Sequence, residues 1–199
     1  RDVGDDGSLS GTGGGGLSAQ AFRGVSFLHN DSYADEIRLM RNHGLIDRNT
    51  VKKFGYVSRM DALQAAILSW KVENYLESVN KRRRSNAIIY ANRLPKETIK
   101  PFEDPSDYSV FHTYVIQTNR RDSLKEYLAA RGVGTAIHYP IPIHKQPAYV
   151  NRYGKTLRFP LSVTEKQASE IISLPIHQNL KIESIIYIAE QISRFFRKK

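Results

Sequence analysis

The chain has 199 residues, and 40% of them are hydrophobic, so it can bury one large core or two small ones. It contains no cysteine, which excludes a disulfide framework, a thiolate nucleophile and cysteine-ligated zinc, and which fits a reducing cytoplasm. No apolar run reaches membrane-spanning length, so we expect a soluble protein without a membrane partner. The formal net charge of +10 leaves nucleic acids and phosphorylated small molecules open as partners.

Much of the positive charge lies in two clusters, at residues 81–84 and 194–199. Both fall in segments with helical patterning, and the second also complements the C-terminal end of a helix dipole. We therefore interpret both clusters as solvated helix faces and predict no nucleic-acid partner. A basic nucleic-acid-binding protein is kept as a weaker alternative.

Residues 1–24 differ from the rest of the chain, since aspartates and a glycine run dominate them. This composition is typical of a flexible segment. Gly11, Gly13 and Gly16 match the spacing of a dinucleotide-binding loop, but no apolar strand precedes them and no amphipathic helix follows directly. The match is therefore interpreted as a chance result of the glycine run.

A long helix is the main element expected after residue 25. A short strand at 25–28, a cap beginning at Asn30 and a helix ended by Gly44 come before it. No glycine or proline interrupts the run between Gly55 and Pro95, and its first half carries regularly spaced apolar residues, namely Met60, Leu63, Ile67 and Trp70. We expect Ser58 or Asp61 to cap this helix. Its apolar first half should be packed and its basic second half solvated.

The remaining patterning alternates strands and helices, which favours a small α/β domain with helices on one face of a sheet. The expected elements are a strand at 111–117, a helix capped by Asp122 and ending before Gly132, a strand at 133–138, a helix begun by a capping box at Thr164 and running through Ile172, a strand at 173–177, and a last helix whose apolar stripe runs from Ile182 to Phe196.

A proline-rich stretch at residues 134–149 holds the candidate binding residues His138, Tyr139 and His144. Its three prolines should exclude helix and hold the chain in a stiff extended path. Both histidines could instead be structural residues bonded to the backbone. No third acidic or imidazole ligand lies at coordinating spacing, so no metal site is predicted.

Three stretches carry a family resemblance: Arg41-Asn-His-Gly44, the segment from Gly55 to Ala66, and the His-Tyr-Pro-x-Pro-x-His-x-Gln pattern that begins at His138. They resemble signatures of the DegT/StrS family of nucleotide-sugar aminotransferases, which are pyridoxal-phosphate enzymes. The resemblance implies an α/β fold, the C-terminal part of an aspartate-aminotransferase-like architecture, with a long connecting helix and a small α/β domain. Residues 25–58 would then be the edge of the large cofactor domain, and residues 59–199 the long helix and small C-terminal domain.

The resemblance also implies a reaction and its partners. An amino group would pass from an amino acid such as glutamate to a keto-sugar attached to a nucleotide, with pyridoxal 5'-phosphate as cofactor and a homodimer as the complete enzyme. Arg59 would bind the phosphate of the cofactor or a carboxylate, and His138, Tyr139 and His144 would border the nucleotide sugar. Val57 stands where the family usually has an asparagine that donates to the cofactor phosphate, and a valine side chain cannot donate.

The lysine that anchors the cofactor has no match here. The family position falls near Gly16, and no lysine precedes Lys52. No catalytic residue is therefore assigned, and we expect a portion of an aminotransferase that is inactive alone. A frameshift, a mis-called start or a truncated reading frame would explain the change of composition before Ser26. The alternative is a non-catalytic remnant or interaction module that pairs with a full-length subunit.

Overall fold

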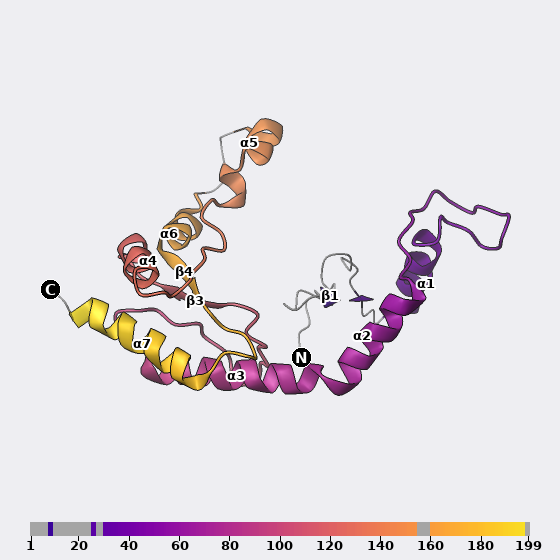
Figure 1. The fold of residues 1–199 in the computed structure, drawn as a ribbon. Coiled ribbons are helices and arrows are strands. Elements are labelled where there is room, and N and C mark those ends of the chain that lie inside the picture. The colour runs from indigo at the N-terminus through magenta and orange to yellow at the C-terminus, as the bar shows by residue number, and fades with distance from the viewer. Residues whose placement is uncertain (1–7, 10–24, 27–29, 155–159, 198–199) are drawn as a thin grey trace. The chain divides into compact units, whose positions relative to one another are not determined.

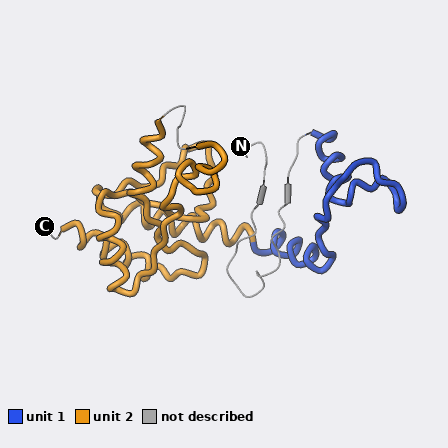
Figure 2. Tube along the Cα trace, turned by 90° about the horizontal axis from the view of Figure 1, so that it is seen from above, with its two compact units in different colours: residues 1–75 blue, residues 76–199 orange. Residues whose placement is uncertain are grey.

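The computed structural model describes residues 8–9, 25–26, 30–154 and 160–197. The chain forms two compact units, residues 1–75 and residues 76–199 (Figure 2). The segment expected to be flexible lies almost wholly outside the described residues. The boundary expected after Ser58, between the edge of a large domain and the long helix with the small domain, stays a prediction. The assignment of these parts to the domains of a larger enzyme stays a prediction.

The described part of the first unit contains two short strands and two helices. Strand β1 (Ser8–Leu9) pairs antiparallel with β2 (Val25–Ser26), and helices α1 (Asp31–Met40) and α2 (Ala62–Asn74) follow. Both expected helix caps are present. The side chain of Asn30 accepts from the Ser32 amide at 3.0 Å, and that of Asp61 accepts from the Leu63 amide at 2.9 Å. Each cap satisfies an amide that the first helical turn leaves unpaired.

The prediction of one uninterrupted long helix is wrong. The helical run divides at Tyr75, where φ is −129° and ψ is −32°, and α3 (Leu76–Arg93) begins at the next residue. The expected burial is also reversed, because α2 buries none of its residues whereas α3 buries Asn86, Ala87 and Tyr90. Apolar patterning marks a face that can be covered, but burial also needs an element to cover it.

The basic cluster at residues 81–84 is not a solvated face, which corrects the sequence-based interpretation. Only Lys81 is exposed, whereas Arg82, Arg83 and Arg84 are partly buried. Nη1 of Arg83 donates to three backbone carbonyl groups at 3.1–3.2 Å, those of Phe111, His112 and Ile176. Arg84 pairs with Glu103 and donates to the Ser109 carbonyl at 2.6 Å. The cluster therefore holds loops of the second unit against α3.

A two-stranded antiparallel sheet forms the centre of the second unit. Strand β3 (Tyr114–Gln117) pairs with β4 (Ile171–Leu174), from Tyr114 opposite Leu174 to Gln117 opposite Ile171. The strand expected at 133–138 is reduced to a single bridge between Ala136 and Ser173. Strand β4 also begins two residues earlier than expected, so Ile171 and Ile172 belong to the sheet and not to the helix before it.

The helices of this unit correct three further details. Helix α4 (Arg121–Ala129) takes Arg120 as its cap residue, so Asp122 lies in the first turn. Helix α6 (Ser162–Glu170) begins after Leu161 without a side-chain cap, so Thr164 does not start it. The proline-rich stretch contains a 3₁₀ turn (Ile143–Lys145) and a short helix, α5 (Pro147–Tyr153). Pro147 fits its first position because the amide there has no helical acceptor.

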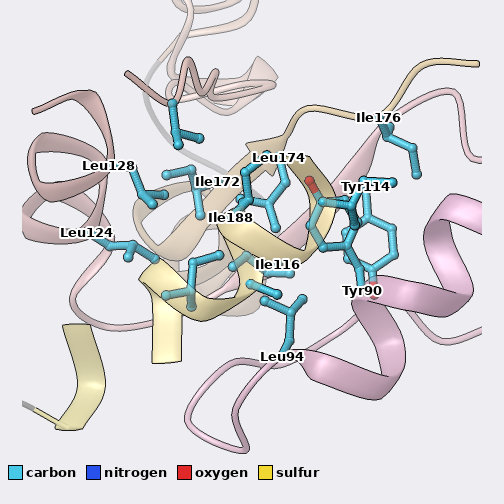
Figure 3. Packing of buried hydrophobic residues seen from close by; sticks show 14 of the residues in the cluster. Tyr90, Leu94, Tyr114, Ile116, Leu124, Leu128, Ile172, Leu174, Ile176 and Ile188 are labelled. Carbon is cyan, nitrogen blue, oxygen red and sulfur yellow. The ribbon is translucent and has the colours of Figure 1, made fainter. Parts of the chain in front are cut away.

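The core of the second unit lies between the sheet and helices α3, α4 and α7 (Figures 1 and 3). Helix α7 (Ile182–Arg197) confirms the predicted last helix, and Ile185, Ala189 and Ile192 of its stripe are buried. The Tyr90 hydroxyl donates to the Pro175 carbonyl at 2.9 Å. No described helix is both long and apolar enough to cross a membrane.

Candidate functional site

In the first unit, two of the sequence motifs pair directly through their backbones. The Tyr56 amide donates to the Met40 carbonyl at 2.7 Å, and the His43 amide donates to the Tyr56 carbonyl at 3.0 Å. The Ser58 amide then donates to the Arg41 carbonyl at 2.9 Å. The loop before α2 is thus fixed against the end of α1, and the motifs form one structural feature, which we call the paired loop (residues 40–44 and 55–59).

Two glycines make this close approach feasible. A Cβ atom on Gly44 would lie 1.7 Å from the Lys53 carbonyl oxygen, and its φ of +72° is one that side chains rarely allow. A Cβ atom on Gly55 would lie 2.3 Å from the Gly44 amide nitrogen. His43 also has a positive φ, of 61°, so the turn is made by the His-Gly pair. These glycines follow from backbone geometry, and no separate role in chemistry is needed to explain them.

The paired loop presents Arg59 on its surface. The Arg59 side chain is exposed, and its Nη1 donates to Asn42 Oδ1 at 3.3 Å. Among the described residues no carboxylate lies within ion-pair distance of Arg59. A guanidinium with one long bond to a neutral amide retains donors for a phosphate or carboxylate. Val57 is 72% exposed and bridges to Asn42 through the backbone. The donor set beside Arg59 therefore fits an anionic group such as a cofactor phosphate.

The second unit carries the other predicted site residues. His138 Nδ1 lies 2.9 Å from the Oγ of Ser173, so this residue of β4 holds the imidazole ring. The backbone of Ala136 forms a bridge to the same residue, Ser173. Tyr139 is 74% exposed, and its ring meets that of His138 edge-on with centroids 5.6 Å apart. These two side chains offer a polar ring and an aromatic face at one place on the surface. Contact with a substrate stays a prediction for both.

A polar cluster of His144, Lys145 and Glu165 joins the proline-rich stretch to α6. Nε2 of His144 lies 3.0 Å from Glu165 Oε1, the His144 side chain is only 8% exposed, and Lys145 Nζ lies 2.7 Å from Glu165 Oε2. Lys145, and then His144, lower the pKa of the Glu165 carboxyl. The two histidines thus bond to side chains, and not to the backbone as the structural alternative supposed. The cluster ties the proline-rich stretch to α6.

Sequence reasoning missed the residues that hold the predicted site residues. Asn42, Glu165 and Ser173 are separated in sequence from Arg59, His144 and His138 by 17, 21 and 35 positions. Asn42 was visible as part of a motif. Glu165 was visible only within the supposed capping box at Thr164, and Ser173 only as a strand residue. No local pattern pairs either with a histidine, because these contacts depend on how α6 and β4 pack.

Comparison with known proteins places this arrangement in a family. Residues 19–193 match the family model of the DegT/DnrJ/EryC1/StrS aminotransferases. The chain belongs to this family. It is 35% identical over 185 residues to a pleiotropic regulatory protein of Geobacillus stearothermophilus, covering 91% of this chain and 49% of that protein. It is 36% identical over 171 residues to UDP-2-acetamido-2-deoxy-3-oxo-D-glucuronate aminotransferase of Pseudomonas aeruginosa, covering 85% and 46%.

Solved structures of DegT-family aminotransferases confirm the expected fold. The chain superposes with a TM-score of 0.82 and 29% identity on DesV of S. venezuelae, solved in complex with a ketimine intermediate, over 88% of this chain and 47% of that one. An aminotransferase of this family from Brucella abortus gives a TM-score of 0.80 at 31% identity, over 88% and 46%. The chain spans about half the length of the relatives it matches, as expected for a C-terminal part of this fold.

Proposed function

We propose that this DegT-family chain is the C-terminal portion of a pyridoxal-phosphate-dependent aminotransferase that acts on a nucleotide-linked keto-sugar in the cytoplasm. The family membership carries the proposal, together with the activities of relatives named for UDP- and dTDP-linked sugars. NtdA of Bacillus subtilis, a structural neighbour at 26% identity, was solved with bound pyridoxamine phosphate as its cofactor. An amino acid such as glutamate would donate the amino group, and a homodimer would be the complete enzyme.

The paired loop supports the assignment of Arg59 to an anion of the cofactor or the substrate. When bound, pyridoxal phosphate supplies the aldehyde and the electron-accepting ring that carry an amino group between substrates. Arg59 would hold an oxyanion through its free guanidinium donors, while Nη1 donates to Asn42 Oδ1 at one edge of the guanidinium. Val57 adds no side-chain donor, so the guanidinium and backbone amides must neutralise the phosphate here.

The second unit would supply the contacts to the nucleotide sugar. His138, held by Ser173, can exchange hydrogen bonds with a hydroxyl or phosphate oxygen through its Nε2. Tyr139 offers an exposed ring for stacking and a hydroxyl for bonding. The nearly buried His144 would act mainly by holding the proline-rich stretch in place through Glu165.

Amino transfer also needs a lysine amine that anchors the cofactor and moves the proton. We propose that this chain alone lacks that lysine, because none precedes Lys52 in the sequence. Incubation with pyridoxal phosphate followed by borohydride reduction and peptide mapping tests this. We expect no adduct confined to one lysine and no turnover with glutamate and a UDP-keto-sugar. A specific adduct together with turnover would contradict the proposal.

Complementation tests the positive part of the proposal. The N-terminal half of the Pseudomonas relative, which we expect to carry the lysine, is mixed with the full chain, and amino transfer is measured. Arg59→Gln should abolish most of the restored turnover, whereas Arg93→Gln, which changes another exposed arginine, should leave it unchanged. If the chain binds a full-length relative tightly but never restores turnover to the half-enzyme, the interaction-module alternative replaces the enzyme portion.

A further inference from the structure

A pocket on the second unit has no place in the function proposed above. It has a volume of about 370 Å³ and is lined by Tyr127, Arg131, Gln191, Arg194 and Arg197. Tyr127 lies in the last turn of α4 and Arg131 in the turn just after it, and the other three residues come from the last two turns of α7. Its volume lies within the range of small-ligand sites. Three arginines in one small concavity need an explanation, because like charges repel when they are brought together.

Aromatic packing fixes the floor of this pocket. The Tyr127 ring packs on the ring of Phe195 with centroids 5.2 Å apart, and the Arg131 guanidinium lies 3.4 Å from the centre of the Tyr127 ring. Nη1 of Arg131 donates to the Tyr127 carbonyl at 2.9 Å, and the Tyr187 hydroxyl donates to the Arg131 carbonyl at 3.3 Å. Arg131 is therefore held in one orientation before any ligand arrives, which lowers the entropy cost of binding.

Gln191 adds a neutral polar side chain to the lining of the pocket. The residue as a whole is only 5% exposed, so the core holds it in place. A ligand seated in the pocket can accept a hydrogen bond from Nε2 of Gln191.

The charges of the lining define the ligand further. Arg194 has one acidic neighbour, Glu190, at the long distance of 3.8 Å, and Arg197 has no acidic partner among the residues that the structure describes. Three guanidinium groups against one carboxylate leave the site strongly positive. Planar guanidinium groups bind phosphate oxygens with paired hydrogen bonds. A group with several oxygens and at least two negative charges can contact all three arginines and the amide together.

We propose that this pocket is a binding site for a diphosphate group, either as free pyrophosphate or as part of a nucleoside diphosphate. This proposal does not rest on the amino-transfer activity, because no residue of the pocket belongs to the site proposed for that activity. The positive site is built from parts already fixed by the core, through Phe195. Its ligand supplies the negative charge and the acceptor atoms that the pocket lacks.

Isothermal titration calorimetry of the full chain tests the site with inorganic pyrophosphate, uridine diphosphate and sulfate at matched ionic strength. Pyrophosphate should bind more tightly than sulfate. Arg197→Gln and Gln191→Leu should each weaken it by about tenfold or more, since each removes a hydrogen bond, in one case a charged one. Arg93→Gln is the matched control, because Arg93 lies exposed in the last turn of α3. Circular dichroism verifies that Gln191→Leu folds.

The outcomes are distinct from those of the aminotransferase experiments, because no cofactor or turnover is measured. Tighter binding of uridine diphosphate than of pyrophosphate identifies a nucleotide as the ligand, and equal binding identifies the diphosphate group alone. The proposal is overturned if sulfate binds as tightly as pyrophosphate, or if Arg93→Gln weakens binding as much as Arg197→Gln does. It is also overturned if the Arg197→Gln protein binds as tightly as the unmodified chain.

Discussion

Substitution of Gly55 by alanine should open the paired loop that presents Arg59. The added Cβ atom would lie 2.3 Å from the Gly44 nitrogen, 2.6 Å from the Met40 oxygen and 2.7 Å from the His43 carbonyl carbon. All three are backbone atoms, so no flexible side chain can move aside to relieve the clash. The two strands of the loop must separate locally, which weakens the three backbone hydrogen bonds between them.

The size of the effect follows from the cost of inserting one carbon into a closely packed place. Such overpacking costs about 1–3 kcal/mol, which corresponds to an increase of about five- to 150-fold in the local opening equilibrium. The change should appear in the amides that bond across the loop, those of His43, Tyr56 and Ser58. Loss of this geometry should also lower the affinity of Arg59 for a bound anion.

Amide hydrogen exchange measured residue by residue is the direct assay, because local opening sets the exchange rate of these amides. Gly134→Ala is the matched control, since a Cβ atom there meets no atom within 4 Å and its φ is not positive. The control should be neutral or slightly stabilising, by about 0.4–1 kcal/mol. If Gly55→Ala leaves exchange at Tyr56 as slow as in the unmodified chain, the steric reasoning is refuted.

Four further predictions follow from the structure. Arg83→Met should lower the free energy of unfolding in urea by about 1.5–3 kcal/mol by leaving three carbonyl groups without their donor. Lys81→Met, at an exposed position of the same cluster, should change it far less; equal effects would contradict the assigned role. The folded state lowers the pKa of Glu165 below its ordinary value of 4.5, so its stabilising contribution is present above that pH and is lost on acidification. Glu165→Gln should therefore be less stable than the unmodified chain at about pH 7, and the difference should shrink as the pH falls below 4.5; a difference that does not change with pH would argue against it. Burial raises the pKa of Tyr114 to about 12 in the folded chain, so Tyr114 ionises at a lower pH in the unfolded chain than in the folded one. The free energy of unfolding should therefore fall as the pH rises above about 10. If Tyr114 absorbs as tyrosinate near its ordinary pKa while the chain stays folded, its hydroxyl is not buried. The exposed apolar residues of α2, including the 61% exposed Trp70, should cause self-association that Trp70→Ser reduces in sedimentation velocity; a stable monomer of the unmodified chain would be the contrary result.

The sequence by itself determined the features that depend on neighbouring residues. The caps at Asn30 and Asp61 are local, because a side chain bonds an amide two positions away. The last helix is evident from its apolar stripe, and Ile185 and Ile192 are buried as that stripe requires. The family signatures were also readable, since each is a short continuous stretch, and the match over residues 19–193 confirms them. The roles of individual site residues stay predictions.

Only the tertiary structure decided which surfaces are covered and which partners meet. The basic run at 81–84 is partly buried and the apolar start of α2 is mostly exposed, which is the reverse of what their patterning predicted. Arg83 is partly buried because it donates to carbonyl groups of residues 111, 112 and 176, which are distant in the sequence. Likewise, Ser173 and Glu165 reach the two histidines only after β4 and α6 have packed. Hydrogen bonds and burial between distant segments depend on which segments the fold brings together, and no local pattern of residues records this.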